Sequence, residues 1–281
     1  MRQSGNVEDR RGAPGGGFRM SPMGLGGGFR GGGLGLGGLL VVLVLGWIMG
    51  INPLQLLSGG GAPIDPGPST SAPGAQPTDE AGAMVTAVLG DTEDFWNQQF
   101  RAAGSTYPVP VMVLFSEAVN SACGTASSAV GPFYCPRDRK VYLDTNFFNE
   151  LDRRFGAPGD FAQAYVVAHE VGHHIQNVLG LLGQNPGVSR SEANQQSVQQ
   201  ELQADCLAGM WGRSAAQRNK LELGDVEEGL TAAAAIGDDR IQKQTQGRVV
   251  PECFTHGSSA QRVAAFRQGL ESADMRGCGV R

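Results

Sequence analysis

Apolar residues in the second half of the chain recur at the three- and four-residue spacing that brings them to one face of a helix. This spacing predicts four helices, over residues 161–179, 191–216, 225–236 and 258–272. Asp160 stands where the first helix needs an N-cap, and Gly180 follows where that helix should end. Ser258 and Gln261 have the spacing of a capping box, which supports the start of the last helix.

The region before these helices predicts further helix and two strands. Helical spacing over residues 79–103 is interrupted at Gly90 and Asp91, so we expect one broken helix or two short ones. Residues 109–115 form an apolar run typical of a buried strand, and residues 140–144 a shorter run typical of an edge or half-buried strand. Helices, then strands, then helices imply an α+β fold, in which a small sheet packs on a mainly helical body.

The first 78 residues lack the pattern of a packed domain. Residues 1–33 are dominated by Gly, Arg, Met and Ser, and we expect a disordered tail there. Residues 34–57 contain no ionisable side chain, which predicts one transmembrane helix; a cleaved signal peptide or a buried core helix is the alternative. Residues 58–78 are rich in Gly, Pro and Ser and form a predicted linker, so the folded domain should cover residues 79–281.

The charges around the apolar segment predict its orientation. Five arginines precede the segment, whereas the linker that follows it carries the acidic Asp65. By the positive-inside rule the N-terminus is then cytoplasmic and the domain extracytoplasmic, in a protein held in the cell membrane by a single pass.

Five cysteines give an independent indication of the compartment. None of them stands in a C-x-x-C pair, which argues against a zinc ribbon or a thioredoxin-like redox site. Closure of the shortest loops favours disulfides from Cys123 to Cys135 and from Cys253 to Cys278, with Cys206 left over. Such pairing fits an oxidising compartment; five reduced cysteines in the core are the alternative.

The net charge and the placement of basic residues indicate which partners are excluded. The formal net charge is -5, and no run of interleaved basic and aromatic residues stands in the second half of the chain. We therefore expect no nucleic-acid partner. A content of 41% hydrophobic residues allows one sizeable core, while 43 glycines and 15 prolines indicate that part of the chain is linker.

The candidate chemistry is concentrated in the predicted helix 161–179, which contains the sequence H-E-x-x-H. Because residues four apart share a helix face, His169 and His173 can converge on one metal ion. Glu170 stands between them, where a carboxylate can take a proton from a zinc-bound water and deliver it to the leaving amine. The motif therefore predicts a zinc site with a general base.

Four residues within or just after the motif refine this prediction. Gly172 costs stability in a helix interior, which indicates the close approach of another backbone. His174 points off the metal face and is expected at the surface or in packing contacts. Gln176 and Leu179 occupy the places where the extended H-E-x-x-H-x-x-G-x-x-H motif has its glycine and third histidine, so that motif is excluded.

A catalytic zinc site needs a third protein ligand. The best candidate is Glu201 on the next predicted helix, which stands four residues before Asp205 and shares its face. Glu201 would bind zinc, while Asp205 would accept the free ring N–H of a ligand histidine. Glu192 is the competing ligand, but the helix dipole explains a carboxylate in the first turn. Cys206 stands about 140° around the helix from Glu201 and is a poor fourth ligand.

His256 is the only histidine outside the zinc-motif helix. It precedes the helix that Ser258 can cap, and the positive end of that helix favours a neutral ring. A neutral ring still donates one hydrogen bond, so His256 is a candidate donor to the oxyanion of a tetrahedral intermediate. A loop histidine that orders the turn, and a metal ligand in place of Glu201, are the alternatives.

These motifs together resemble the bacterial putative neutral zinc metallopeptidase family. The resemblance rests on H-E-V-G-H-H at His169, E-L-Q-A-D-C at Glu201, G-P-F-Y-C-P at Gly131 and F-T-H-G-S-S at Phe254, within residues 79–279. The zinc motif is also similar to that of the gluzincins, including thermolysin-like peptidases, whose E-x-x-x-D motif supplies the third ligand and its supporting aspartate. The resemblance implies a zincin-like domain with Zn²⁺ as cofactor and the same roles for the glutamate and aspartate chosen above.

Two functions follow from these observations. The first is a zinc endopeptidase that cleaves peptide or protein substrates outside the membrane, with residues 140–144 pairing with the substrate as an added strand. A hydrolase of cell-wall amides is a variant of it. The second is a catalytically idle, zinc-stabilised binding or scaffold domain. Glu170 favours the enzyme, because a structural zinc site closes its fourth position with Cys or His. The substrate and the oligomeric state stay open.

Overall fold

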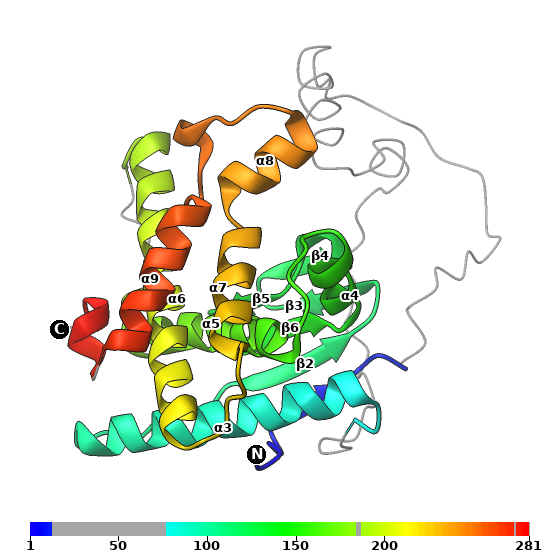
Figure 1. Ribbon diagram of the computed structural model, residues 1–281, viewed down its shortest axis with the longest axis vertical. Helices are drawn as coiled ribbons and strands as arrows, with labels where there is room; N and C mark the ends of the chain where they lie inside the picture. Colours follow the sequence, from blue (N-terminus) through cyan, green and yellow to red (C-terminus); the bar gives the residue numbers. More distant parts are fainter. Residues whose placement is uncertain (13–76, 184–186, 273, 281) are drawn as a thin grey trace, which may run out of the picture. The chain divides into compact units, whose positions relative to one another are not determined.

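The structure, a computed structural model, describes residues 1–12, 77–183, 187–272 and 274–280 (Figure 1). The strands are β1 (Val7–Asp9), β2 (Val111–Phe115), β3 (Ala118–Ser121), β4 (Gly124–Ser127), β5 (Phe133–Cys135) and β6 (Lys140–Asp144). The helices are α3 (Glu80–Ala102), α4 (Asn146–Arg153), α5 (Asp160–Val178), α6 (Arg190–Gln217), α7 (Asp225–Ala235), α8 (Asp238–Gln246) and α9 (Ser259–Glu271). Short 3-10 helices cover Ser128–Val130 (η1), Pro251–Cys253 (η2) and Met275–Cys278 (η3).

The predicted membrane segment, residues 34–57, lies outside the described residues, as do most of the predicted tail and linker. None of the helices that the structure does describe has both the length and the apolar character of a membrane span.

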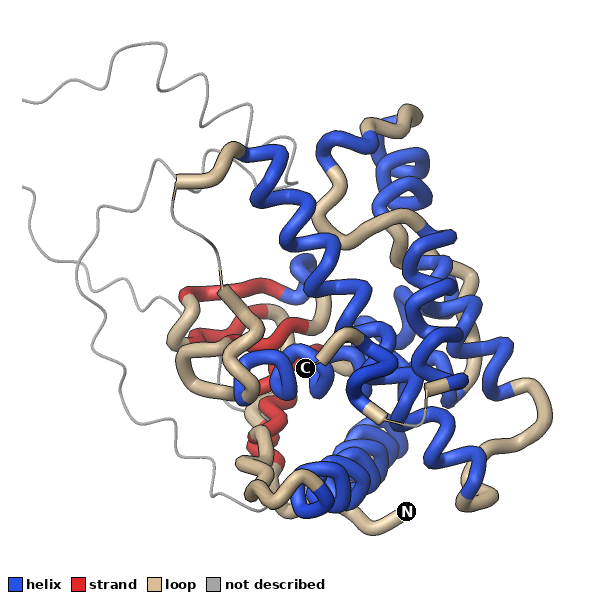
Figure 2. Tube along the Cα trace, turned by 90° about the vertical axis from the view of Figure 1, so that its left-hand side faces the viewer, coloured by secondary structure: helices blue, strands red, loops and turns tan. Residues whose placement is uncertain are grey.

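A four-stranded sheet in the order β1-β2-β6-β5 lies to one side of the helices, as the red strands in Figure 2 show. β2 pairs in parallel with β1 and β6, and β5 pairs antiparallel with β6. The strand predicted over residues 140–144 is confirmed, but the expectation that it is an edge or half-buried strand is wrong, because both edges of β6 are occupied. Val141 and Leu143 enter the main core, whereas Tyr142 packs on the other face with Phe115 and Val119. The predicted α+β class, with a small sheet packed on a mainly helical body, is confirmed.

Helix α5 runs through the helical body and packs against α3, α6 and α7. Gly159 is its N-cap, with φ 110°, so the predicted capping by Asp160 is wrong. The cap comes instead from α7, where the carboxylate of Glu228 accepts a hydrogen bond from the backbone N–H of Phe161. A Cβ at position 159 would lie 2.0 Å from that carboxylate, so only glycine leaves room for this cap. The predicted capping box of Ser258 and Gln261 at the start of α9 is confirmed.

Helix α3 is continuous, so the expected break at Gly90 and Asp91 is wrong. Gly90 instead makes room for the N-terminal segment, since a Cβ there would lie 2.3 Å from the carbonyl oxygen of Arg2. Glycine and aspartate at these positions serve tertiary contacts, which a local pattern cannot distinguish from a helix break.

Residues 1–12 belong to the folded domain, and the expectation of a disordered tail is wrong for them. β1 pairs along its length with β2, and Val7 is buried in the main core. On α3, the buried carboxylate of Glu93 accepts hydrogen bonds from side chains of this segment: Arg2, Ser4 and Asn6. A strand of three residues is too short to show a hydrophobic period, which is why the sequence did not reveal it.

The structure contains two disulfides. Cys123 pairs with Cys135, as the spacing predicts, but Cys206 pairs with Cys278, so the predicted bond between Cys253 and Cys278 is wrong. Cys253 is free and exposed. Close packing of α9 on α6 is the reason: a Cβ at Gly269 would lie 2.0 Å from the carbonyl oxygen of Cys206. The segment after α9 therefore lies against α6, so that Cys278 can bond to Cys206 across a sequence separation of 72 residues.

The network around Asp91 should be a main support of α3. Asp91 is buried and accepts hydrogen bonds from Trp211, Arg218 and Lys220. Burial raises its pKa, but the two cations more than offset this and bring the pKa of Asp91 to about 2. We predict that Asp91→Ala lowers the free energy of unfolding by about 2–3 kcal/mol, because the indole N–H and both cations lose their partner.

Asp94→Ala on the same helix is the matched control. Asp94 is half exposed and pairs with Arg2 at the surface, so its loss should cost under about 1 kcal/mol. Urea unfolding of both variants measures the difference, and equal losses would contradict the prediction.

Candidate metal centre

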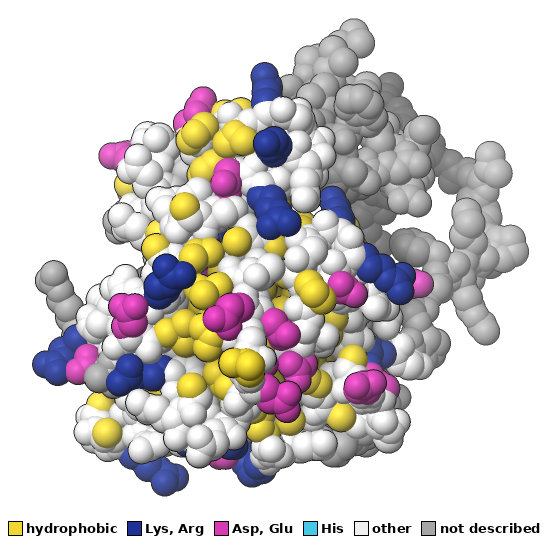
Figure 3. Space-filling view, in the orientation of Figure 1, with side chains coloured by type: hydrophobic (Ala, Val, Ile, Leu, Met, Phe, Trp, Pro, Cys, Tyr) yellow, Lys and Arg dark blue, Asp and Glu magenta, His cyan; other side chains and the backbone are white. Residues whose placement is uncertain are grey.

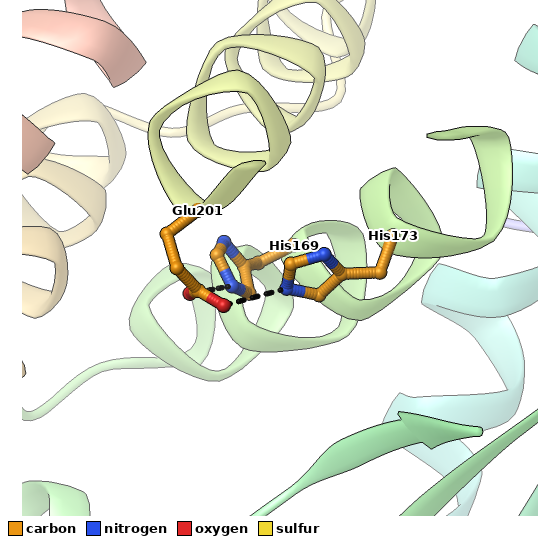
Figure 4. A group of neighbouring side chains, drawn as sticks. All are labelled: His169, His173 and Glu201. Atoms are coloured by element: carbon orange, nitrogen blue, oxygen red, sulfur yellow. Dashed lines mark hydrogen bonds and ion pairs between the residues drawn. The ribbon is translucent and has the colours of Figure 1, made fainter. Parts of the chain in front are cut away.

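Three side chains from two helices meet at one point: His169 and His173 on α5, and Glu201 on α6 (Figure 4). Nε2 of His169 lies 3.2 Å from one carboxylate oxygen of Glu201, and Nε2 of His173 lies 3.3 Å from the other. One ligand atom from each residue lies within 4.8 Å of the other two. Two imidazole nitrogens and a carboxylate are a donor set that Zn²⁺ accepts in catalytic sites.

The close approach of α5 and α6 brings these ligands together. Gly172 faces the backbone of Ala204, and a Cβ at Gly172 would lie 2.9 Å from the carbonyl oxygen and 3.0 Å from the Cα of Ala204. The glycine thus has the role that its position in the helix predicts. Any side chain at position 172 would push α6, and Glu201 with it, away from the two histidines.

The other ring nitrogen of each histidine has a hydrogen-bond acceptor. Nδ1 of His169 lies 2.8 Å from a carboxylate oxygen of Asp205, the contact that the sequence leads us to expect. Nδ1 of His173 lies 2.9 Å from the side-chain oxygen of Gln176. With Nδ1 as donor in both rings, each Nε2 presents its lone pair to the centre. Sequence reasoning missed this role of Gln176, although its i, i+3 spacing from His173 was a usable signal.

Arg262, on α9, is a second residue that sequence reasoning missed. Its guanidinium donates to both oxygens of Asp205, each at 2.9 Å, and its side chain is only 2% exposed. Burial alone would raise the pKa of Asp205, but Arg262 and His169 more than offset it and lower that pKa. The carboxylate therefore stays ionised as the acceptor for His169. The two partners stand 57 residues apart, and no sequence signal links them.

The electrostatics of the ligands suit a bound cation. Burial would raise the pKa of Glu201, but His173 and His169 hold it well below its ordinary value. Burial lowers the pKa of His169, yet Asp205 and Glu201 outweigh it and raise the pKa to about 10. Positive charge is thus stabilised at this point, which favours a bound divalent cation. The residues present fit zinc.

Glu170 is buried beside both histidines, and its Oε2 has no hydrogen-bond partner within the described part of the chain. Burial raises the pKa of Glu170, while His173 and His169 oppose the shift. A buried carboxylate oxygen without a partner is costly, so such an atom calls for a functional explanation. Glu170 also lines the cavity described next, where a water or a substrate group can reach it.

The centre opens into a cavity of about 510 Å³. β5 and the loop before it supply part of the lining, and β5 is the last strand of the described sheet on that side. Apolar side chains from other elements complete it: Phe147, Phe155, Ile236 and Ile241. The lining is more apolar than polar, and its charged side chains include Glu150 and Arg154 besides the candidate metal ligands.

His256 lines the same cavity and its side chain is 53% exposed. Its Nδ1 lies 3.1 Å from Asp238, and this hydrogen bond raises the pKa of His256 above the ordinary 6.5. Asp238 therefore opposes the effect of the helix end, which favours the neutral ring. The other oxygen of Asp238 accepts hydrogen bonds from three backbone N–H groups of the loop: Thr255, His256 and Gly257. One carboxylate thus fixes both the loop and the ring.

Two further candidates lie away from the centre. His174 is fully buried, with Nδ1 3.0 Å from the hydroxyl of Tyr134 and Nε2 2.6 Å from the carbonyl oxygen of Pro108. Burial lowers its pKa to about 4, so the ring is a neutral packing group that ties α5 to β5. Glu192 forms the capping box of α6 with Ser189, and so is the first-turn charge that the sequence suggests.

The fold and this centre define a class of protein: an α+β domain with a candidate metal site built from an H-E-x-x-H helix and a glutamate on the next helix. The family model of the putative neutral zinc metallopeptidases matches residues 1–280, and the chain belongs to that family.

Two relatives illustrate how far the similarity extends. The uncharacterized protein YpfJ of Escherichia coli is 47% identical over 289 residues, which cover 99% of this chain and 96% of that protein. An uncharacterized protein of Mycobacterium tuberculosis is 48% identical over 183 residues, which cover 61% of this chain and 62% of that protein. No solved structure matches the chain significantly.

Metal binding should separate the two glutamates of α6. We predict about one Zn²⁺ per chain, and an affinity that Glu201→Gln reduces far more than Glu192→Gln does. Gln176→Ala, which removes the acceptor of His173, should weaken binding by about 10- to 100-fold. Elemental analysis and competition with a chromophoric chelator give these values. Equal affinities in the two glutamate variants would contradict the assignment of Glu201.

Proposed function

We propose that the protein is a zinc metallopeptidase that hydrolyses peptide bonds, with His169, His173 and Glu201 as metal ligands and Glu170 as general base. The observation that carries the proposal is the unpartnered, buried oxygen of Glu170 beside a three-donor site. A centre that only stabilises the fold has no need of that carboxylate, because its fourth position is closed by another ligand.

A bound Zn²⁺ would supply Lewis-acid polarisation of the scissile carbonyl and lower the pKa of the attacking water. The carboxylate of Glu170 would act as the general base toward the attacking water and return the proton to the leaving amine. Because its burial raises its pKa, the carboxyl group can hold the proton between the two steps. Asp205 and Gln176 keep the two imidazole rings oriented during both.

His256 is the proposed donor to the oxyanion of the tetrahedral intermediate. Its Nδ1 is engaged by Asp238, and no hydrogen bond to its Nε2 is formed by the described residues. The raised pKa keeps a larger share of the rings protonated near neutral pH, and a charged ring is a stronger donor than the neutral one. The partial exposure of the side chain leaves it free to turn toward a substrate.

The proposed substrate is an extended peptide or protein segment. The sequence suggested pairing with residues 140–144, but both edges of β6 are occupied. β5 has one edge that no described strand covers, and its residues Phe133 and Tyr134 line the cavity. An extended chain could therefore add to the sheet at β5 and pass the centre, with its side chains in the apolar part of the cavity.

The proposal places this activity outside the cytoplasm, in a protein attached to the membrane through residues 34–57. The two disulfides support an oxidising compartment. On the face that Figure 3 shows, acidic and basic side chains are interspersed. Such a surface favours a peptide partner over a polyanion such as nucleic acid.

Activity is tested with a peptide-library digest by the purified full-length protein. We predict that Glu170→Gln keeps its zinc and lowers kcat/KM by about 10²- to 10⁴-fold, because proton transfer to and from the water is lost. Glu150→Gln is the matched control: Glu150 also lines the cavity, but its side chain is half exposed, and turnover should be retained. No cleavage by zinc-loaded wild-type protein would instead favour the scaffold function.

The pH dependence of kcat/KM should report His256. If the protonated ring is the donor, the rate falls as the pH rises through the raised pKa of His256. Asp238→Asn removes the main cause of that shift, so the alkaline limb should move to lower pH. His256→Ala should lower the rate by about 10²- to 10³-fold with unchanged zinc content. An alkaline limb that does not move in Asp238→Asn would remove His256 from the mechanism.

A further inference from the structure

The N-terminal segment, residues 1–12, is held at one end by a buried acid. Glu93 on α3 is 3% exposed, and its carboxylate accepts hydrogen bonds from Arg2 at 2.8 Å, Ser4 at 2.6 Å and Asn6 at 2.8 Å. Within the described part of the chain, this carboxylate has no partner outside the segment. The segment thus supplies all the hydrogen-bond donors that the described residues give this buried carboxylate, as a buried acid requires.

The backbone and core of the domain also depend on the segment. The N–H of Met112 in β2 donates to the carbonyl oxygen of Asn6, and the N–H of Arg10 donates to the carbonyl oxygen of Leu114. Val7 is 3% exposed and belongs to the main core. Removing β1 would leave β2 as an open, apolar edge, which is prone to pair with other chains.

The other end of the segment is fixed by ion pairs. Arg11 contacts both Asp9 and Asp79, the N-cap of α3, and Lys140 in β6 lies 2.6 Å from Glu8. The segment, drawn in blue in Figure 1, runs beside α3 and β2. Contacts of three kinds, a buried acid, strand pairing and ion pairs, therefore connect it to the domain along its whole length.

We infer that residues 1–12 and the domain that begins at α3 fold together in one compartment, so that the N-terminus lies on the same side of any membrane as the metal centre. A single crossing by residues 34–57 would separate two parts that are paired in the fold. The orientation that the arginines suggest, with a cytoplasmic N-terminus and an extracytoplasmic domain, is therefore replaced. The disulfides assign both parts to the oxidising side. The inference does not depend on catalysis.

Site-specific labelling of the full-length protein in spheroplasts tests the compartment. Cys253 is free and exposed, and reports the domain. A Gln3→Cys variant in a Cys253→Ser background reports the N-terminus, because residue 3 is exposed. We predict that a membrane-impermeant maleimide labels both cysteines before lysis. Labelling of both only after lysis would support a common compartment but overturn its assignment to the oxidising side. Labelling of one before and the other only after lysis would overturn the inference.

Two matched substitutions test whether the segment is docked. Val7→Asp puts a carboxylate into the core, whereas Gln3→Asp makes the same charge change at an exposed position of the same segment. We expect Val7→Asp to lower Tm and to speed hydrogen exchange at the Met112 amide, which donates to Asn6. Gln3→Asp should change neither. Val7→Ala gives the same direction with a smaller loss, should the aspartate variant not fold. Equal behaviour of the Val7 and Gln3 variants would contradict docking.

Discussion

The contact between α5 and α6 at Gly172 and Ala204 determines where the candidate metal ligands lie. On α5 the glycine stands between His169 and His173 in the sequence, and on α6 the alanine stands between Glu201 and Asp205. Because no side chain separates the helices there, the approach is as close as a backbone contact. One packing contact therefore fixes both the distance from Glu201 to the two Nε2 atoms and the distance from Asp205 to the ring of His169.

Charge balance is the second constraint on the centre, which contains two buried carboxylates, Glu170 and Asp205, and the partly buried Glu201. Arg262 binds Asp205 with two hydrogen bonds and so compensates one negative charge. Both histidines lie against Glu201, where a bound cation would compensate its charge. Helix α9 carries Arg262 and packs closely on α6, and the disulfide of Cys206 fastens the following segment to the same helix. The C-terminal part of the chain is thus part of the centre, although it supplies no metal ligand.

The two ends of the sheet have different roles. β1 pairs with β2 and forms one terminal strand of the sheet, supplied by the beginning of the chain. At the opposite end no described strand covers β5, and that strand lines the cavity. Both terminal strands are three residues long, and of the two only β5 lines the cavity, where the proposed chemistry lies. The strand order therefore places the N-terminal segment at one edge of the sheet and the cavity at the other.

The sequence alone determined what depends on spacing within a helix. The i, i+4 histidines, the glycine between them, the E-x-x-x-D pair and the capping box of α9 are local patterns, and the structure has them where they were predicted. Only the tertiary structure decided what joins distant segments: β1 on β2, β6 inside the sheet, Asp238 on His256, Arg262 on Asp205, and Cys206 with Cys278. A local pattern shows which residues share one face of a helix or strand. These contacts depend instead on which elements pack together, and that is decided by how the whole chain buries its apolar side chains.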